Sequence, residues 1–205
     1  MNAHIEAVGY VATAMAASQF VPQVIRTSRS HDTAGVSSGM FAILVAQAGA
    51  WMGYGIRQHL FPPVLTNVML GYCGIVMVRL LVINRAPHIR RAIAAIIGAL
   101  VFEVLAYLFA PDAVLGVVAA VGAFILLWPQ VLVVFTRTDL SGLSLGSWLL
   151  SIGNTILWMA YGLGRHSMLL LLSAGQGLVL SLVIVARMMF VQRHARTLAT
   201  VVPSD

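Results

Sequence analysis

Two pairs of side chains in this sequence have the types and the spacing of a binding site for a polar solute. Gln47 precedes Trp51 by four residues, and Asn154 precedes Trp158 by four residues. Residues four positions apart lie on one face of a helix. An indole ring packs on the apolar face of a sugar ring, and an amide both donates and accepts hydrogen bonds with hydroxyl groups. The pairs therefore predict contacts to a small neutral solute, for which a sugar is the best candidate.

Asn67 adds a further amide to the predicted site. Measured from the intervening short loop, Trp51 and Asn67 lie at similar depths, each about 8 to 9 Å in at 1.5 Å per residue. When Trp51 is aligned with Trp158, the position equivalent to Asn67 holds Ala174, and the nearest polar residues are Ser173 and Gln176. We therefore expect a site with unequal halves, in which Ser173 and Gln176 also bind solute.

Long apolar runs must position these side chains. The sequence is 60% hydrophobic and only 9% charged, whereas about a quarter of the residues of a soluble domain are charged. A run of about 20 apolar residues crosses a membrane as a helix, which satisfies its own backbone hydrogen bonds. We predict an all-α integral membrane protein with seven transmembrane helices, over 6–25, 37–56, 61–83, 92–110, 113–135, 143–163 and 167–189.

Arginines lie almost entirely on one side of the predicted spans. That side holds Arg26, Arg29, Arg79, Arg85, Arg90, Arg91, Arg137, Arg187, Arg193 and Arg196. The other side holds only Arg57 and Arg165. The positive-inside rule then places the N-terminus outside the cell membrane and a tail at 192–205 in the cytoplasm. Topology accounts for the basic charge, so no nucleic-acid partner is expected.

The sequence contains an internal repeat. A single ungapped shift aligns Pro22/Pro129, Gln23/Gln130, Asp32/Asp139, Gly35/Gly142, Ser37/Ser144, Gly39/Gly146, Trp51/Trp158, Met52/Met159, Tyr54/Tyr161, Gly55/Gly162 and His59/His166. Two units of three helices run in the same direction only if one helix inverts the chain between them. The repeat therefore predicts two parallel three-helix bundles, 6–83 and 113–189, joined by an inverting linker helix at 92–110 in a 3+1+3 layout.

The Pro-Gln pairs belong to a longer pattern in each copy. The first reads Pro22, Gln23, Asp32, Gly35, Val36 and Ser37, and the second reads Pro129, Gln130, Asp139, Gly142, Leu143 and Ser144. This pattern resembles the PQ-loop motif. Two such motifs joined by a linker helix resemble the SWEET sugar transporters and their half-sized SemiSWEET relatives, over about residues 6–189.

The resemblance implies a sugar transporter that works by alternating access, with Trp51 and Asn67 flanking the sugar. The wider PQ-loop group also contains amino-acid carriers and members that do not transport. A proton-coupled amino-acid or vitamin carrier, and a receptor or assembly factor without transport, therefore stay open as alternatives. Relatives of this fold form homo-oligomers, so the expected partners are a small solute, membrane lipid and further copies of the chain.

The Pro-Gln pairs also predict a gate. A proline inside a helix removes one backbone hydrogen bond and bends the helix. Pro22 and Pro129 lie near the arginine-rich ends of their spans, and the amides of Gln23 and Gln130 can donate to the carbonyls left free. Paired bends at this depth would open and close the cytoplasmic end.

Ionisable residues bear on the mechanism. The predicted site contains none, which favours facilitated diffusion over proton coupling. Glu103 in the linker helix is either a proton site or a partner of a neighbouring helix or subunit. Asp32 and Asp139 are expected to cap helices or pair with nearby arginines. His59 and His166 lie in short outer loops without a nearby carboxylate or thiolate, so no metal site is expected there.

Other functions lack their residues. The sequence holds no Ser/His/Asp set, no cluster of metal ligands and no phosphate-binding loop, so neither an enzyme nor a cofactor is expected. Cys73 is the only cysteine. Tyr54 and Tyr161 lie near the outer ends of their spans, where the aromatic belt of the membrane interface is the expected location. The tail from Gln192 is expected to be disordered.

Overall fold

The computed structural model describes residues 3–30, 37–136 and 144–201 of the chain. Its helices are α1 (Ala3–Ser30), α2 (Ser38–Arg57), α3 (Phe61–Ile83), α4 (Ile89–Phe109), α5 (Asp112–Thr136), α6 (Leu145–Gly164) and α7 (Met168–Val201). Every predicted span coincides with one of these seven helices, which confirms the all-α fold. The expectation of a disordered tail from Gln192 was wrong in part, because α7 continues to Val201. Good helix formers such as Ala195 and Leu198 support that extension.

The repeated residues begin and end equivalent helices. Ser37 caps α2 and Ser144 caps α6, each accepting a hydrogen bond from the backbone N–H three residues later, at 3.2 and 3.3 Å. At the other ends, His59 and His166 both adopt a left-handed conformation, with φ of 54° and 53°. This turn lets the next N–H bond back to the last turn of the helix. The two copies therefore share their local structure as well as their sequence.

Within the described ranges, five helices, namely α2, α3, α4, α5 and the Met168–Val191 part of α7, are long and apolar enough to cross a membrane. α1 and α6 fall outside that group because polar side chains interrupt them, among them Gln19 and Asn154. Both helices pack against apolar neighbours within the bundle. Polar groups are tolerated at membrane depth where they face the protein interior. The chain is therefore a multi-pass membrane protein.

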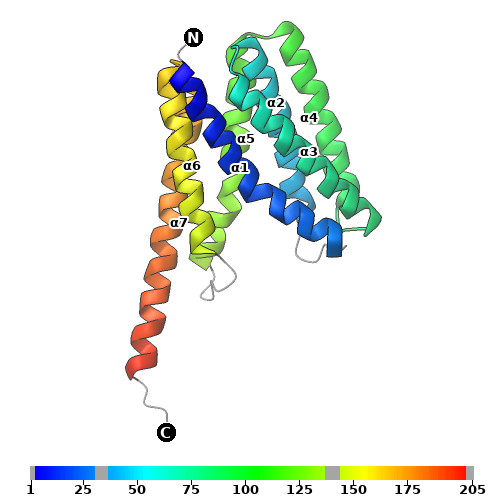
Figure 1. Cartoon of the computed structure of the whole chain (residues 1–205). Coiled ribbons are helices and arrows are strands. Elements are labelled where there is room, and N and C mark those ends of the chain that lie inside the picture. The colour runs from blue at the N-terminus through cyan, green and yellow to red at the C-terminus, as the bar shows by residue number, and fades with distance from the viewer. Residues whose placement is uncertain (1–2, 31–36, 137–143, 202–205) are drawn as a thin grey trace.

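Six helices form a closed ring in the order α1, α3, α2, α5, α7, α6, and each contacts the next. The first three belong to one repeat and the last three to the other, and each contact within one repeat has its counterpart in the other. The repeats meet where α1 packs on α6 and where α2 packs on α5. Figure 1 shows α4 outside this ring, where it packs mainly on α2. This is the predicted 3+1+3 layout.

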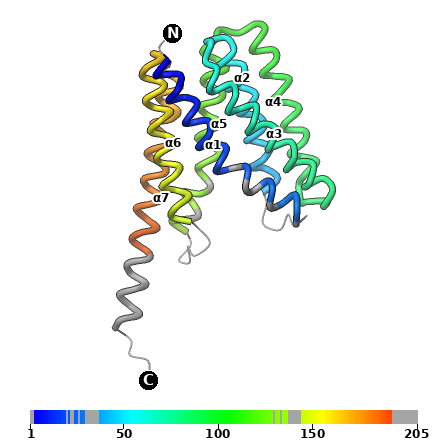
Figure 2. The backbone as a smooth tube through the Cα atoms, in the orientation of Figure 1, coloured from blue at the N-terminus to red at the C-terminus, as the bar shows by residue number. Residues whose placement is uncertain are grey.

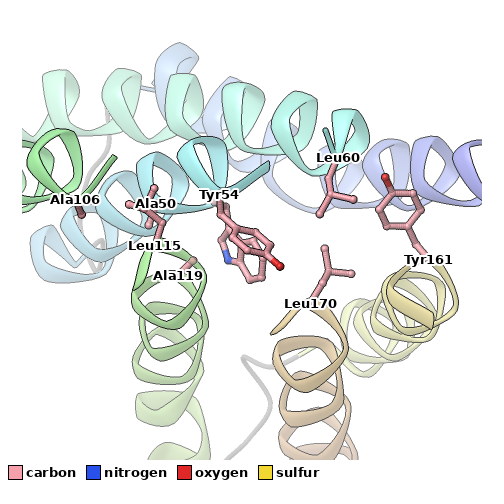
Figure 3. Packing of buried hydrophobic residues seen from close by; sticks show 9 residues of the cluster. Ala50, Tyr54, Leu60, Ala106, Leu115, Ala119, Tyr161 and Leu170 are labelled. Atoms are coloured by element: carbon pink, nitrogen blue, oxygen red, sulfur yellow. The ribbon is translucent and has the colours of Figure 1, made fainter. Parts of the chain in front are cut away.

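The bundle has two unlike ends. The N-terminal end is where α1 begins and where α2 joins α3, α4 joins α5 and α6 joins α7, and the arginine-rich end is the opposite one (Figure 2). At the N-terminal end, one apolar cluster draws on both repeats, and Figure 3 shows Leu60 there with Tyr161 and Leu170. Nearer the arginine-rich end, the buried members of one cluster come only from α5 and α7 and those of another only from α2 and α3. The two repeats are thus joined most tightly at the N-terminal end.

Candidate solute-binding site

A cavity of about 170 Å³ lies inside the six-helix ring. Its lining residues are Ala16, Gln47, Trp51, Pro63, Thr66, Asn67, Leu70, Ala123, Asn154, Trp158, Leu170, Ser173 and Ala174. Every ring helix contributes at least one of them, and α4 contributes none. The cavity therefore lies between the two repeats, where parallel repeats in a transporter place their solute.

The cavity follows the internal repeat almost completely. The shift that lays Pro22 on Pro129 also pairs the lining residues, as Ala16/Ala123, Gln47/Asn154, Trp51/Trp158, Pro63/Leu170, Thr66/Ser173 and Asn67/Ala174. Among the described residues, Leu70 alone lines the cavity without a counterpart that does so. The site is thus an approximately two-fold arrangement in which Asn67 faces an alanine.

The two tryptophans are held in the same way. The ring centroids of Trp51 and Tyr54 are 5.9 Å apart with an interplanar angle of 76°. The rings of Trp158 and Tyr161 are also 5.9 Å apart, at 86°. Such edge-to-face pairs are favourable for aromatic rings and fix their orientation. Each indole therefore reaches the cavity from a rigid position, supported by a tyrosine one turn nearer the N-terminal end.

Two amide oxygens in the cavity wall have unused hydrogen-bonding capacity. Oε1 of Gln47 on α2 and Oδ1 of Asn154 on α6 are buried and have no hydrogen-bond partner in the described part of the chain. A buried polar atom without a partner is costly, so such atoms are uncommon unless they serve a ligand or water. These two acceptors lie one helical turn from the two tryptophans, where a solute that carries hydroxyl groups can donate to them.

The third helix of each repeat supplies the remaining polar groups. Asn67 is buried and its Nδ2 donates to the carbonyl of Pro63, one turn earlier in α3, at 2.8 Å. That bond occupies one of the two amide N–H groups and leaves the carbonyl oxygen available to accept. Thr66 donates to Thr13 Oγ1 on α1 at 2.8 Å, which joins α3 to α1 beside the cavity. Ser173 lies at the equivalent position of α7 and lines the cavity too.

Most of the predicted solute contacts are brought together. Gln47, Trp51, Asn67, Asn154, Trp158 and Ser173 all line the cavity. Gln176 is not among the lining residues, and its Nε2 donates to the carbonyl of Ala120 on α5 at 2.8 Å. In this structure Gln176 therefore joins α7 to α5 and does not line the cavity.

The predicted hinge residues are only partly described. α1 is helical through Pro22 and Gln23, and α5 is helical through Pro129, but the side chains of these three residues lie outside the described part. Gln130 is described, and its Oε1 is buried without a hydrogen-bond partner among the described residues. The aspartates of the motif, Asp32 and Asp139, fall outside the described ranges. The hinge role of these residues stays a prediction.

Thr66 and Ala16 are lining residues that the sequence reasoning missed. The repeat indicates Thr66, because Thr66 is the counterpart of Ser173 in the first copy. Ala16 carries no chemical signal of its own. A small side chain there matters because it leaves room for the cavity, and it follows a pattern only through its counterpart Ala123.

Tyr54 and Tyr161 lie beside the two cavity tryptophans, toward the N-terminal end. The expectation that they lie in the aromatic belt was wrong, because their side chains are 5% and 0% exposed. The hydroxyl of Tyr54 lies 3.0 Å from Ser167 Oγ, and that of Tyr161 donates to Glu6 at 3.5 Å. Both bonds join one repeat to the other. The tyrosines are buried because the two repeats converge at this end.

Two ion pairs reinforce the same end. Arg57 at the end of α2 lies 2.8 Å from Asp112 at the start of α5. Arg165 after α6 lies 3.3 Å from Glu6 near the start of α1, and it also donates to the carbonyl of His59 at 2.9 Å. Each pair joins the second helix of one repeat to the first helix of the other. The arginines on the N-terminal side therefore act as links between the repeats in this conformation.

Comparison with known proteins agrees with this geometry. The chain matches the PQ loop repeat family twice, over residues 5–64 and 113–171, which together make up more than half of its length. It is similar to the sugar transporter SemiSWEET of Leptospira biflexa, with 32% identity over 62 residues that cover 30% of this chain and 73% of that protein. It is similar to the sugar transporter SemiSWEET of Escherichia coli, with 29% identity over 66 residues that cover 32% and 74%.

A solved structure shows the same fold over nearly the whole chain. The 3.7 Å structure of a eukaryotic SWEET transporter matches with a TM-score of 0.78 at 13% identity, and the match covers 92% of this chain and 97% of that one. The family match covers two repeats, as the internal symmetry of the ring requires. These findings identify the chain as a member of the SWEET and PQ-loop family of membrane proteins.

Proposed function

We propose that this protein carries small neutral polar solutes, most favourably sugars, across the cell membrane by facilitated diffusion. The observation that carries the proposal is the pair of unpartnered amide oxygens, Gln47 Oε1 and Asn154 Oδ1, in one cavity with Trp51 and Trp158. Hydroxyl groups of a sugar can donate to the amides while its ring packs on the indoles. The similarity to two SemiSWEET sugar transporters supports the same solute class.

The chemistry of the lining favours an uncharged solute. None of the lining residues is ionisable, so the cavity offers no counter-ion to a carboxylate or an ammonium group. Charges are costly at membrane depth unless they are paired. An amino-acid zwitterion therefore fits this cavity less well than a sugar does. The absence of an ionisable lining group also favours facilitated diffusion within the site itself.

The size of the cavity favours a monosaccharide. Its volume of about 170 Å³ lies below the roughly 300 to 1,000 Å³ of pockets for drug-sized ligands. A solute with one sugar ring is therefore better suited than a disaccharide in this conformation. Asn67, Ser173 and Thr66 supply further hydroxyl and amide groups around such a ring.

Alternating access would come from rocking of the repeats 6–83 and 113–189 against each other. The links between the repeats lie at the N-terminal end, through Tyr54 with Ser167 and Arg165 with Glu6. Toward the arginine-rich end, the ribbons of α6 and α7 diverge from α1 and α3 (Figure 1). With the arginine-rich end in the cytoplasm, as the positive-inside rule favours, the links at the N-terminal end would close this conformation toward the outside. Pro22 and Pro129 would provide the bends on which the halves move.

Counterflow uptake in proteoliposomes tests the proposal. Labelled glucose, sucrose and a panel of amino acids would be offered to the wild type and to the double variant Gln47→Ala/Asn154→Ala, with and without a proton gradient. We expect glucose uptake that needs no proton gradient and does not accumulate glucose when one is applied, and that is lost in the double variant. Asn84→Ala is the matched control, because this amide lies at the end of α3, away from the cavity, and donates to the carbonyl of Leu80 in its own helix.

Other results would redirect the function. Uptake of amino acids that depends on the proton gradient would replace sugar diffusion by a proton-coupled carrier. A folded protein with no flux of any solute would favour a receptor or assembly role. Loss of uptake in Asn84→Ala as severe as in the double variant would show that the amides act through folding rather than through solute contact.

A further inference from the structure

Glu103 is a buried carboxyl group that the solute cavity does not use. It lies on α4, where only Ala92, Glu103 and Ala106 are buried. Its side chain is 6% exposed, and Oε2 has no hydrogen-bond partner in the described part of the chain. At 1.5 Å per residue, Glu103 lies about 9 Å along the helix from Phe109, within the depth of the hydrocarbon core. A carboxyl group at this depth needs a partner or a proton.

The carboxyl group fits against a glycine of α2. In this arrangement the carboxyl group occupies the space beside Gly49, and a Cβ atom at that position would displace Oε2 of Glu103. One turn further along α2, Gly53 faces Leu115 of α5. A second cavity of about 270 Å³ opens beside these residues, lined by Gly49, Met52, Gly53, Ile56, Leu100, Glu103, Val104, Tyr107, Leu108 and Leu115. Apart from Glu103 and Tyr107, its lining is apolar.

Among the described residues, no cation is available to Glu103 from the neighbouring elements. α4 itself contributes Tyr107, one turn away, and α2 contributes Arg57, whose guanidinium group lies 5.8 Å from the Tyr107 ring centroid. Arg57 is held by Asp112 of α5 at 2.8 Å. α3, which also touches α4, supplies no residue to this second cavity. An ionised carboxylate without a counter-ion is costly in apolar surroundings, so this conformation favours the uncharged acid.

The second cavity lies on a junction between the two repeats. Met52 and Ile56 come from α2 of the first repeat, and Leu115 comes from α5 of the second. The contact between α2 and α5 is one of the two that join the repeats. Movement of α5 away from α2 would widen this cavity toward the water at the N-terminal end, and water stabilises the carboxylate. The two protonation forms of Glu103 therefore favour different conformations.

We propose that Glu103 binds a proton and thereby biases the protein toward the conformation closed at the N-terminal end. This inference rests on the alternating-access mechanism proposed above, and it adds to that mechanism a control site outside the solute pathway. The direction of the pH effect follows from the solvation of the carboxyl group. Acidic conditions favour the uncharged carboxyl group and the closed N-terminal end, and alkaline conditions favour the carboxylate and the open end.

Distance measurements by pulsed electron spin resonance test this inference without any solute. Spin labels on Phe61→Cys and Met168→Cys, in a Cys73→Ala background, would report the opening at the N-terminal end. These residues begin α3 and α7, are repeat-related, and are 55% and 65% exposed. The doubly labelled protein with Glu103 intact would be measured in lipid nanodiscs. As the pH rises from about 5 to about 9, we expect the fraction of molecules with the longer label distance to increase about threefold or more. In Glu103→Gln the population should stay low and constant, while Glu103→Asp should keep the response.

A chemical probe provides the second arm. A membrane-soluble carbodiimide reacts with protonated carboxyl groups, so mass spectrometry should find the adduct on Glu103, more at acidic than at alkaline pH. The same pH response in Glu103→Gln, or no response in the labelled protein with Glu103 intact, would overturn the inference. Absence of carbodiimide labelling on Glu103 would overturn it too. Because neither readout uses a solute, these failures are distinct from a failure of sugar transport.

Discussion

The first repeat and the second repeat build the same framework and fill it differently. Their helices make equivalent contacts around the ring, and Trp51 and Trp158 rest on Tyr54 and Tyr161 with the same centroid separation of 5.9 Å. Asn67 of the first repeat, however, faces the cavity opposite Ala174 of the second. The comparison teaches that packing preserved the frame of the duplication while the chemistry of the two walls diverged.

The linker helix adds a second difference between the repeats. α4 packs mainly on α2, and its equivalent place beside α6 is not occupied by any described helix. Glu103 therefore packs against the first repeat, at Gly49, and no described helix places a counterpart beside the second. The first repeat thus carries both the extra amide in the cavity and the buried carboxyl group behind it. The variants below test how far this inequality reaches.

The largest expected effect is the loss of either tryptophan. Trp51→Ala or Trp158→Ala removes an indole from the cavity wall, which should weaken solute binding by about 2 kcal/mol, or about thirtyfold in Kd. Substrate-dependent quenching of the remaining tryptophans, together with counterflow rates, would measure the loss. Phe124→Ala, on the outer face of α5 and 39% exposed, is the control that removes an aromatic ring outside the cavity. Equal binding in the tryptophan variants and the wild type would contradict the site.

The amide difference should produce the next largest effect. Asn67→Ala makes the two walls alike and removes one hydrogen bond to solute, which should lower affinity about three- to tenfold. Ala174→Asn places an asparagine on both walls and should change the order in which the protein prefers different sugars. Competition of unlabelled sugars against a labelled one would measure both. An unchanged order of preference in Ala174→Asn would show that this position does not contact solute.

Repetition made much of the site predictable. The alignment of the two copies and the helical spacing were enough to select Trp51, Trp158, Gln47 and Asn154, because a duplicated helix presents the same face to the same cavity. The repeat and the linker also predicted the 3+1+3 layout, since two parallel units of three helices require an inverter. Helix ends were less predictable, and α7 continues to Val201 because the charge that ends a membrane span does not end a helix.

Contacts between elements were not readable from the sequence. A polar residue on α7 can turn toward solute or toward a neighbouring helix, and Gln176 finds the Ala120 carbonyl on α5. Tyr54 and Tyr161 lie near helix ends, which suggests the membrane interface, but convergence of the repeats buries them. In both cases the deciding fact is which helix lies opposite, and no local pattern in the sequence encodes it.

The two ion pairs at the N-terminal end should contribute unequally to closure. Arg165 and Glu6 have side chains 20% and 10% exposed, whereas those of Arg57 and Asp112 are 29% and 42% exposed. Solvent weakens the more exposed pair, so Arg165→Ala should shift the closed conformation by about 1 kcal/mol and Arg57→Ala by about 0.5 kcal/mol or less. Distances between spin labels on α3 and α7 would give the fractions of the closed and open conformations in each variant. A larger shift in Arg57→Ala would reverse the assignment of the stronger link.

The smallest effect is expected where the two repeats are most alike. Ser37→Ala and Ser144→Ala each remove the side chain that caps the second helix of a repeat, α2 or α6. The two hydrogen bonds lost are 3.2 and 3.3 Å long. Both caps are exposed, so each change should cost about 0.5 kcal/mol, at the lower end for helix caps, and lower Tm by about 1 to 2 °C. Thermal unfolding of purified protein in one detergent would measure the pair. The two caps are equivalent in sequence and geometry, so equal decreases in Tm are expected. Unequal decreases would mean that the repeats differ in stability near the arginine-rich end. The divergence of the repeats would then extend beyond the cavity wall and beyond the side of α2 that carries Gly49.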